Sequence, residues 1–349
     1  MKRRSFVLSA AGAAAASALP IGGWAADQDG PPKQVTRWTF QPAFDSSDAG
    51  WGRGLIPWAK AVEEATQGTV KIRVEPAGAL VSASEAFAAC GQGLSAGYAG
   101  WATVYGGEMP EGFLAYGLAM GARNTREAWD ILWGNPAYRI GEIVQEAART
   151  RNLYWAGWTN QGPNIMVTKF PVRKLEDLKG KKMRAGGPQA LFHKAMGGSP
   201  VSMNAGDIYT AIRLGTIDGT YWDAGGITDM HFEEVTRYAI MPGWNPAQHQ
   251  EIFVNLDKWK ALTPWQRKQI EGIFEKTYFL TSQMHADNVE VALKKFAAAG
   301  GEVITLNDQE VARMRQVSIE KIWPEVAKMS SGNAKGVELW KKYVEQQKS

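Results

Sequence analysis

The segment 182–226 constrains the fold most, because it predicts a strand, a helix and a second strand in one small αβ unit. Asn204 and Asp207 have the spacing of a capping box and predict the start of the helix. A glycine-flanked extended segment with Arg184 precedes the helix, and a Tyr-Trp-Asp triplet at 221–223 follows it after a turn. A cation, an indole and a carboxylate at two ends of this unit predict a pocket for a small acid.

The first 26 residues are typical of a signal peptide and are set aside from the fold. Three basic residues at 2–4 are followed by an apolar run, 6–19, and by small residues that suit cleavage. The pair Arg3-Arg4 followed by Ser-Phe-Val-Leu resembles a twin-arginine export signal. The alternative, a membrane anchor, is disfavoured because the run is shorter than the roughly 20 residues that span a bilayer.

The net charge of the chain bears on whether it binds nucleic acid. The chain has 39 Lys and Arg against 35 Asp and Glu, and three of the basic residues lie in the leader, which leaves a net charge of +1. Such a balance gives no support for nucleic-acid binding.

About 320 residues remain after the leader, which suits two globular lobes. Cys90 is the single cysteine, so packing rather than an internal disulfide must stabilise the fold. The 15 tryptophans suit either an aromatic cleft or a core.

Strands and helices alternate through both halves and predict an α/β fold. The chain begins with a β-α-β unit, and its later part is largely helical, with Pro324 ending or kinking one helix. Residues 160–164 are polar, and we expect them to interrupt a strand where the chain crosses to a second lobe. The expected strands are 34–40, 70–74, 152–158 and 165–168, and the expected helices are 55–65 and two within 125–151 separated near Pro136.

Several motifs in a fixed order resemble a known family. PAGAL followed by SASEAF, LEDLKGKKMRAGG, GGSPVSMNAGDIYTAIRLGTIDG and EIFVNLDKWKALTP are similar to the extracytoplasmic solute-binding subunits of TRAP transporters, the DctP-type family. The resemblance extends over about residues 35–348, and 183–219 is its most specific part. The segment AIMPGWNPAQHQEIFVN further resembles the branch that binds 2-oxo and 2-hydroxy monocarboxylates.

The resemblance implies a two-lobed periplasmic binding protein, with a β-sheet flanked by helices in each lobe and a helical C-terminal region. Lobe I would comprise 33–160 and 250–287, and lobe II would comprise 161–249 and 288–349 with the C-terminal helices. The implied partners are a small organic acid and the TRAP membrane permease. Hinge closure would trap the acid in the periplasm. A monomer and a homodimer paired through the C-terminal helix both remain open.

The resemblance also assigns roles to individual residues. Arg184 would pair with the substrate carboxylate through two parallel N–H donors. In the 2-oxo acid branch a Glu-Trp pair binds a cation through the Glu side chain and the Trp carbonyl. This chain has Tyr221-Trp222 there, so Trp222 is kept and Asp223 is the candidate for the missing carboxylate.

Further ligand positions come from the same resemblance. An amide among Asn160, Gln161 and Asn164 would contact the ligand, with Gln161 also offered to the cation. Glu251 is the expected second carboxylate, and Gln248 and Gln250 are neutral alternatives to it. These oxygen ligands suit Ca²⁺ or Na⁺ rather than zinc.

The wall of the first lobe and the identity of the ligand are less constrained. We expect Tyr98, Trp101 and Tyr105 to line the cleft as a lid wall, with the core as the alternative place for each. Lactate, pyruvate, longer 2-oxo acids and aromatic acids all satisfy one arginine. The same receptor fold for a larger or aromatic carboxylate is therefore the alternative function.

Catalytic motifs are missing from the sequence. The four histidines are scattered without metal-ligand spacing, and no nucleophile elbow or nucleotide-binding glycine loop is present. The expectation is a receptor that is not an enzyme, with a secreted hydrolase or lyase as the alternative from another class.

Overall fold

The computed structural model describes residues 30–44 and 50–347, so the predicted signal peptide lies outside the described residues. The strands are β1 Thr36–Phe40, β2 Val70–Val74, β3 Gly97–Gly100, β4 Leu153–Thr168, β5 Lys182–Arg184, β6 Ser199–Val201, β7 Gly219–Asp223, β8 Tyr238–Asn255 and β9 Glu302–Thr305. The α-helices are α1 Ile56–Ala65, α2 Ala86–Gly91, α3 Ala102–Tyr105, α4 Gly112–Tyr116, α5 Thr125–Trp129, α6 Ile140–Arg149, α7 Gly187–Ala195, α8 Ile208–Arg213, α9 Leu256–Lys260, α10 Pro264–Gly272, α11 Phe274–Ala298, α12 Asp308–Val317, α13 Trp323–Ala327 and α14 Ser331–Gln346. Short 3-10 or π-helical turns are η1 Trp51–Leu55, η2 Asp130–Gly134, η3 Leu175–Leu178, η4 Ala205–Asp207, η5 Phe232–Glu234 and η6 Ser318–Ile322.

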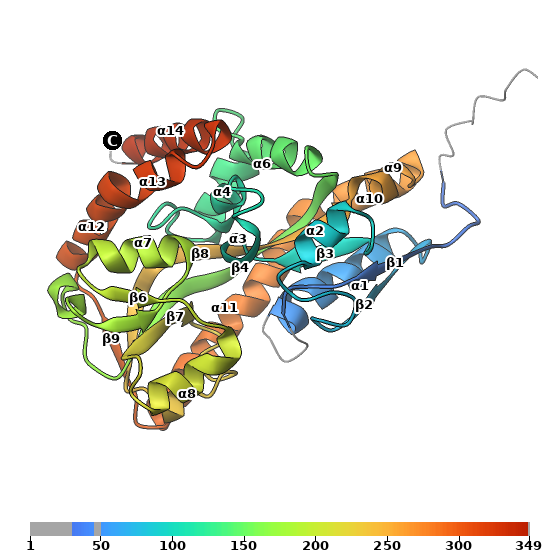
Figure 1. Cartoon of the computed structure of the whole chain (residues 1–349). Helices are drawn as coiled ribbons and strands as arrows, with labels where there is room; N and C mark the ends of the chain where they lie inside the picture. Colours follow the sequence, from blue (N-terminus) through green and yellow to red (C-terminus); the bar gives the residue numbers. More distant parts are fainter. Residues whose placement is uncertain (1–29, 45–49, 348–349) are drawn as a thin grey trace, which may run out of the picture.

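All nine strands join one mixed sheet flanked by helices, which confirms the predicted α/β class. The strand order is β2-β1-β3-β8-β4-β7-β5-β6, with β9 paired to β8. The long antiparallel strands β4 and β8 run through the middle of the molecule, between the blue β1–β2 unit and the yellow-green unit of β6, β7 and α8 (Figure 1).

The predicted interruption at 160–164 is wrong, because β4 continues through these residues as a strand. The irregularity appears instead as register shifts against β8 on either side of Gly162, whose φ of +82° favours glycine. The polar side chains that suggested a loop are buried between packed elements. A polar run normally indicates solvent exposure, but these side chains are buried and have hydrogen-bond partners within the protein.

Helix α11 covers an edge that β4 would otherwise expose. The first part of β4 pairs with β8 only, because β7 joins β4 from Asn164 onward. The Ser282 hydroxyl of α11 accepts a hydrogen bond from the backbone N–H of Asn160 at 3.0 Å. A free strand edge presents unpaired backbone groups, and α11 both shields it and pairs one of them.

Two sets of parallel strands point their carboxyl ends toward each other along β4. Strands β1, β2 and β3 form one set, and β5, β6 and β7 form the other. Since β3 and β7 are antiparallel to β8 and β4 respectively, they run toward each other along the central pair. The end of β3 lies at the level of Trp158 and the end of β7 at the level of Asn164, about 20 Å apart at ~3.3 Å per residue. Ligands of open α/β sheets bind outside such ends.

The apolar core has three parts. One packs Trp38, Trp58 and neighbours under β1–β3, and another packs Ile165, Ile208 and neighbours beside β7. The largest unites residues of β3–β5 and β7–β9 with α4–α7 and α12–α14. Six tryptophans are among the most deeply buried side chains, so they are core residues rather than a cleft lining: Trp58, Trp155, Trp158, Trp244, Trp323 and Trp340.

Most predicted elements are present, and one predicted cap is not. Helix α1 and strand β2 match their predicted ranges closely, and α5 and α6 lie on either side of Pro136. The capping box at Asn204 is wrong, because the Asn204 side chain makes no cap hydrogen bond and a 3-10 turn precedes α8. The regular helix therefore begins at Ile208 rather than beside Asn204.

Candidate functional site

Arg184 ends strand β5, at the carboxyl end of the parallel set formed by β5, β6 and β7. Its guanidinium lies over the Trp222 ring, with Cζ 5.7 Å from the ring centroid, and its Nε donates to the Met203 carbonyl at 3.5 Å. Among the described residues, no Asp or Glu forms an ion pair with Arg184. Burial lowers the pKa of Arg184, while the Tyr116 hydroxyl acts in the opposite direction. A partly desolvated cation without an acidic partner is suited to bind an anion.

Trp222 and Asp223 end strand β7, which pairs with β5. Both side chains are half-buried. The stacking of Trp222 on Arg184 confirms that the strand and the triplet predicted from the segment 182–226 come together. The family resemblance expects the carboxylate at 221, where this chain has tyrosine, and Asp223, directly after Trp222, is the candidate that replaces it.

Gln161 and Trp101 connect the central strands to the end of β3. The Trp101 indole N–H donates to the Gln161 side-chain oxygen, and Trp101 also packs against Phe44 with ring centroids 4.9 Å apart. Trp101 is partly exposed, so it can form part of a cleft wall. The Gln161 oxygen that a cation would use is bonded to this indole.

Asn164 belongs to a buried amide network. Its Nδ2 donates to Gln248 Oε1 at 2.8 Å, and its Oδ1 accepts from Trp244 Nε1 at 2.6 Å and from Gln189 Nε2 at 3.4 Å. The Tyr116 hydroxyl donates to the same Gln248 oxygen at 2.8 Å. Both ends of the Asn164 amide are therefore engaged within the protein, which makes it a structural link between β4 and β8.

The lid-wall prediction is wrong for Tyr98 and Tyr105, which are core residues. Tyr98 is 0% exposed and Tyr105 is 1% exposed; both pack against Phe87, and Tyr105 also packs edge-on against Phe253. Both rings belong to the largest apolar cluster, together with Phe253 of β8. Of the three residues, only Trp101 is partly exposed.

Glu251 lies on β8 beside this aromatic cluster and is fully buried. Its Oε2 accepts from the Tyr105 hydroxyl at 2.8 Å, and its Oε1 has no hydrogen-bond partner within the described chain. Burial raises the pKa of Glu251 well above its usual range, and the Tyr105 hydrogen bond opposes this shift. A buried carboxylate oxygen without a donor is compatible with a cation, and the Gln161 oxygen keeps one lone pair beside its bond to the Trp101 indole.

Tyr116 is a residue of the site that the sequence did not indicate. Burial raises the pKa of its hydroxyl, and the Glu251 and Asp223 charges act in the same direction while Arg184 opposes them. The Tyr116 hydroxyl therefore lies within electrostatic reach of three predicted site residues. Gln189 and Trp244 were also missed, whereas Gln248 was named as a neutral alternative to Glu251 but not as a partner of Asn164.

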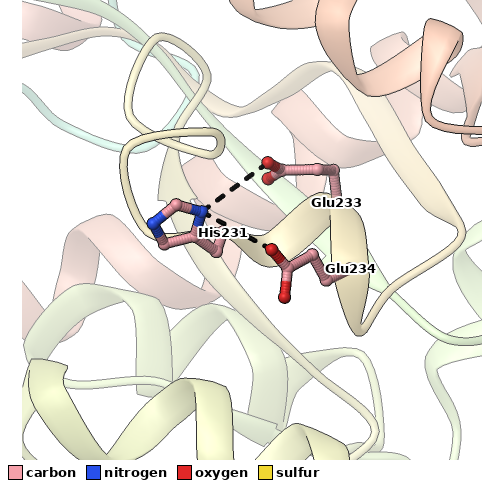
Figure 2. Close-up of side chains that lie close together, drawn as sticks. All are labelled: His231, Glu233 and Glu234. Carbon is pink, nitrogen blue, oxygen red and sulfur yellow. Dashed lines mark ion pairs between the residues drawn. The ribbon is translucent and has the colours of Figure 1, made fainter.

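Another cluster resembles a metal site but is separate from the predicted set. In the described ranges, one group of three or more His, Cys, Asp and Glu side chains has converging ligand atoms, namely His231, Glu233 and Glu234 (Figure 2). His231 Nδ1 is 3.9 Å and 3.7 Å from the two carboxylates, and Tyr209 donates to Glu234 at 2.7 Å. His231 and Glu234 are exposed and Glu233 is half-buried, which is typical of an ion-pair cluster at the surface.

A cavity of about 650 Å³ lies elsewhere as well. It is formed by α6, the start of β4 and helices α9–α11, with Trp133, Tyr154 and Trp259 among its walls. Tyr154 and Trp259 stack on each other, and Tyr154 donates to Glu271, so these groups are already satisfied. The Arg184 region differs from this cavity, because it combines a strand end with a cation that has no acidic partner among the described residues.

The family model for "Bacterial extracellular solute-binding protein, family 7" (DctP) matches residues 44–329. The chain belongs to this family. Members are substrate receptors, so the alternative of a secreted hydrolase or lyase is dropped.

Individual relatives of this DctP protein fit the same picture. It is 26% identical to the monocarboxylate 2-oxoacid-binding periplasmic protein of a Nostoc strain, over 99% of this chain and 94% of the relative. A TRAP transporter solute-binding protein from Bordetella bronchiseptica, with calcium and picolinate in its active site, has a TM-score of 0.78 at 24% identity, covering 90% of this chain and 93% of that one. A protein from Pseudoalteromonas atlantica with bound sodium and pyruvate has a TM-score of 0.76 at 21% identity, covering 90% and 95%. These structural likenesses support the shared fold.

The described part of this DctP protein contains no helix that is both long and apolar enough to cross a membrane.

Proposed function

We propose that the protein captures a small organic carboxylate between two lobes and delivers it to a TRAP membrane permease. One observation carries the proposal: Arg184 is partly desolvated, stacks on Trp222 and has no acidic partner among the described residues. An organic anion would supply the missing negative charge. Because a buried cation without a counter-charge is costly, the site favours acids over neutral solutes.

The substrate class is a 2-oxo or 2-hydroxy monocarboxylate such as pyruvate or lactate. The name of the Nostoc relative and the pyruvate bound to the Pseudoalteromonas protein support this class. The picolinate bound to the Bordetella protein supports the alternative of a larger or aromatic acid. Trp101 and Trp222 suit either, since both present rings beside the site.

A cation, Ca²⁺ or Na⁺, is part of the proposal. Related proteins contain calcium or sodium with their ligands. Asp223 and the Trp222 carbonyl would hold it in this chain, and Glu251 and Gln161 are the proposed further ligands. The Gln161 oxygen keeps a second lone pair beside its bond to the Trp101 indole. The ion would neutralise these carboxylates and share the substrate's oxygens.

The two lobes are proposed as 33–160 with 250–287 and 161–249 with 288–349. The opposed ends of β3 and β7 on the shared strands β4 and β8 support this division, because bending of two strands allows the lobes to close. Export through the leader at 1–26 places the receptor in the periplasm. The oligomeric state stays open between a monomer and a homodimer paired through the C-terminal helix, α14.

The test is Arg184→Ala, measured by calorimetry and thermal shift over a panel of carboxylates with calcium present. We expect affinity to fall on the order of 100-fold or more, because the substrate carboxylate loses its paired charge. Arg173→Ala is the control, since Arg173 is exposed and pairs with Glu302 at 2.7 Å. Near-native affinity in a folded Arg184→Ala variant would contradict the proposal.

A further inference from the structure

One ion pair joins the two proposed lobes. Arg53 Nη2 lies 2.7 Å from Asp229 Oδ2, although the residues are 176 positions apart. Arg53 belongs to η1 in lobe I, and Asp229 lies in lobe II between β7 and η5. Within the described ranges, every other ion pair joins residues of the same proposed lobe.

The Arg53 side of the pair is fixed to lobe I. Gly50 and Gly54 flank the Gln250 side chain so closely that an added Cβ would lie 2.3 Å and 2.5 Å from its amide atoms. Leu55, at the end of η1, is buried in the core under β1–β3. The turn that carries Arg53 therefore has little freedom to move relative to β8.

The Asp229 side is fixed to lobe II. Ala224 and Ile227 of the same loop are buried in the core beside β7, and Asn288 of α11 donates to the Gly225 carbonyl at 2.7 Å. The loop leaves β7 directly after Asp223. Asp229 is thus rigidly connected to the strand that ends with the proposed ligand residues.

The environment makes this pair more effective than a fully exposed one. The two side chains are only 23% and 34% exposed, and Arg53 Nε is buried without a hydrogen-bond partner among the described residues. Solvent and salt screen such a pair less than a surface pair. If the lobes separate, both groups must return to water individually, so the attraction is present only in the closed arrangement.

We propose that Arg53 and Asp229 form a latch that stabilises the closed state and thereby raises the affinity for the captured acid. This inference rests on the proposed function, because it presumes that closure accompanies binding. Apparent affinity scales with the populated fraction of the closed state. Arg53 and Asp229 are positioning residues in this role and need not touch the ligand.

The decisive measurement uses the ligand-free protein. Spin labels at Lys60→Cys on α1 and Arg213→Cys on α8 report the distance between the lobes by pulsed electron paramagnetic resonance, and both positions are exposed. Cys90 is buried, and burial raises the pKa of its thiol to about 12, so it stays unlabelled. We expect Arg53→Gln and Asp229→Asn each to shift the distribution toward longer distances. The charge exchange, Arg53→Asp with Asp229→Arg, should restore it.

The control breaks an ion pair inside one lobe. Glu302→Gln removes the partner of Arg173 and should leave the interlobe distances unchanged. With pyruvate as the probe, each latch variant should bind about two- to fivefold more weakly, and the exchanged pair should recover most of the loss.

Unchanged distances in both single variants would overturn the latch. This outcome is separate from a failure of the proposed function, which would appear as retained carboxylate binding in Arg184→Ala. If no acid binds at all, the distance measurement on the ligand-free protein still decides whether the latch exists.

Discussion

Individual histidines differ sharply in their surroundings, and His285 of α11 is the most informative. It is 1% exposed, and its Nε2 has no partner among the described residues. Burial, reinforced by the Arg53 charge, lowers the pKa of His285 from 6.5 to about 3. The folded protein therefore holds this imidazole neutral at a pH where an unfolded chain would protonate it.

We expect acid sensitivity from this residue. Above pH 6.5 the imidazole is neutral in both states, whereas below it the unfolded chain binds the proton first. The free energy of unfolding then falls by up to about 1.4 kcal/mol per pH unit until pH 3. His285→Gln should flatten the stability curve between pH 6.5 and 4, measured by urea unfolding, while His231→Gln at an exposed position should not. An unchanged slope in His285→Gln would count against this assignment.

The sequence predicted which strand ends come together better than which distant side chains pair. Arg184 and Trp222 lie at the ends of two short strands of one αβ unit, and their contact follows from that local unit. The partners of Asn164 and Tyr105 come from distant segments and were not predicted: Trp244 and Gln248 for the amide, and Glu251 for the phenol. A polar or aromatic residue has the same appearance in a sequence whether its partner is a ligand or another side chain.

At the level of elements, β4 shows how packing overrides local pattern. A polar run with glycine and proline usually indicates a loop, yet here it is a strand because β8 and α11 supply its hydrogen-bond partners. Helices and strands with regular apolar spacing, such as α1 and β2, were predicted closely. Each of these elements buries one face, and the regular spacing of apolar residues along that face is visible in the local sequence.

The contact between α11 and β4 can be tested at Ser282. Its hydroxyl is the partner of the Asn160 backbone N–H, and both residues are buried. Ser282→Ala leaves that N–H unpaired, so we expect the free energy of unfolding to fall by about 1–3 kcal/mol in urea titrations. Ser82→Ala, at an exposed loop position, is the matched control and should change little. Equal stability of Ser282→Ala and the wild type would show that water or another group pairs the N–H.

At the scale of the whole molecule, the proposed cation couples ligand binding to stability. With calcium and pyruvate together, the rise in melting temperature should exceed the sum of the rises with each alone, because each ligand favours the state that binds the other. A ligand at about 100 times its Kd stabilises by about 2.7 kcal/mol. A chelator should remove the calcium-dependent part.

Asp223→Asn should abolish the extra rise in melting temperature that calcium and pyruvate produce together. Asp207→Asn, at an exposed position of η4, should preserve that extra rise. Simply additive shifts in the wild type would argue that calcium and acid bind independently or that one of them does not bind.

The global arrangement is the part that the sequence revealed least directly. The alternation of strands and helices predicted an α/β class, and the family resemblance implied two lobes. The strand order, and the meeting of β3 with the far end of β8, depend on pairing between residues about 150 positions apart, such as Gly97 with Val254. No local sequence pattern predicts such pairing, because it joins residues far apart in the chain. Its main cost is the entropy of closing the long loop between them.

The shared central strands have a consequence for biosynthesis. Strand β3 borders β8 through residues 251–254, so the N-terminal sheet lacks an inner neighbour until that distant stretch has left the ribosome. Neither half of the polypeptide can be cut out as an autonomous unit, since each draws a strand from beyond any single division point. Neither half can fold completely until most of the chain has been synthesised.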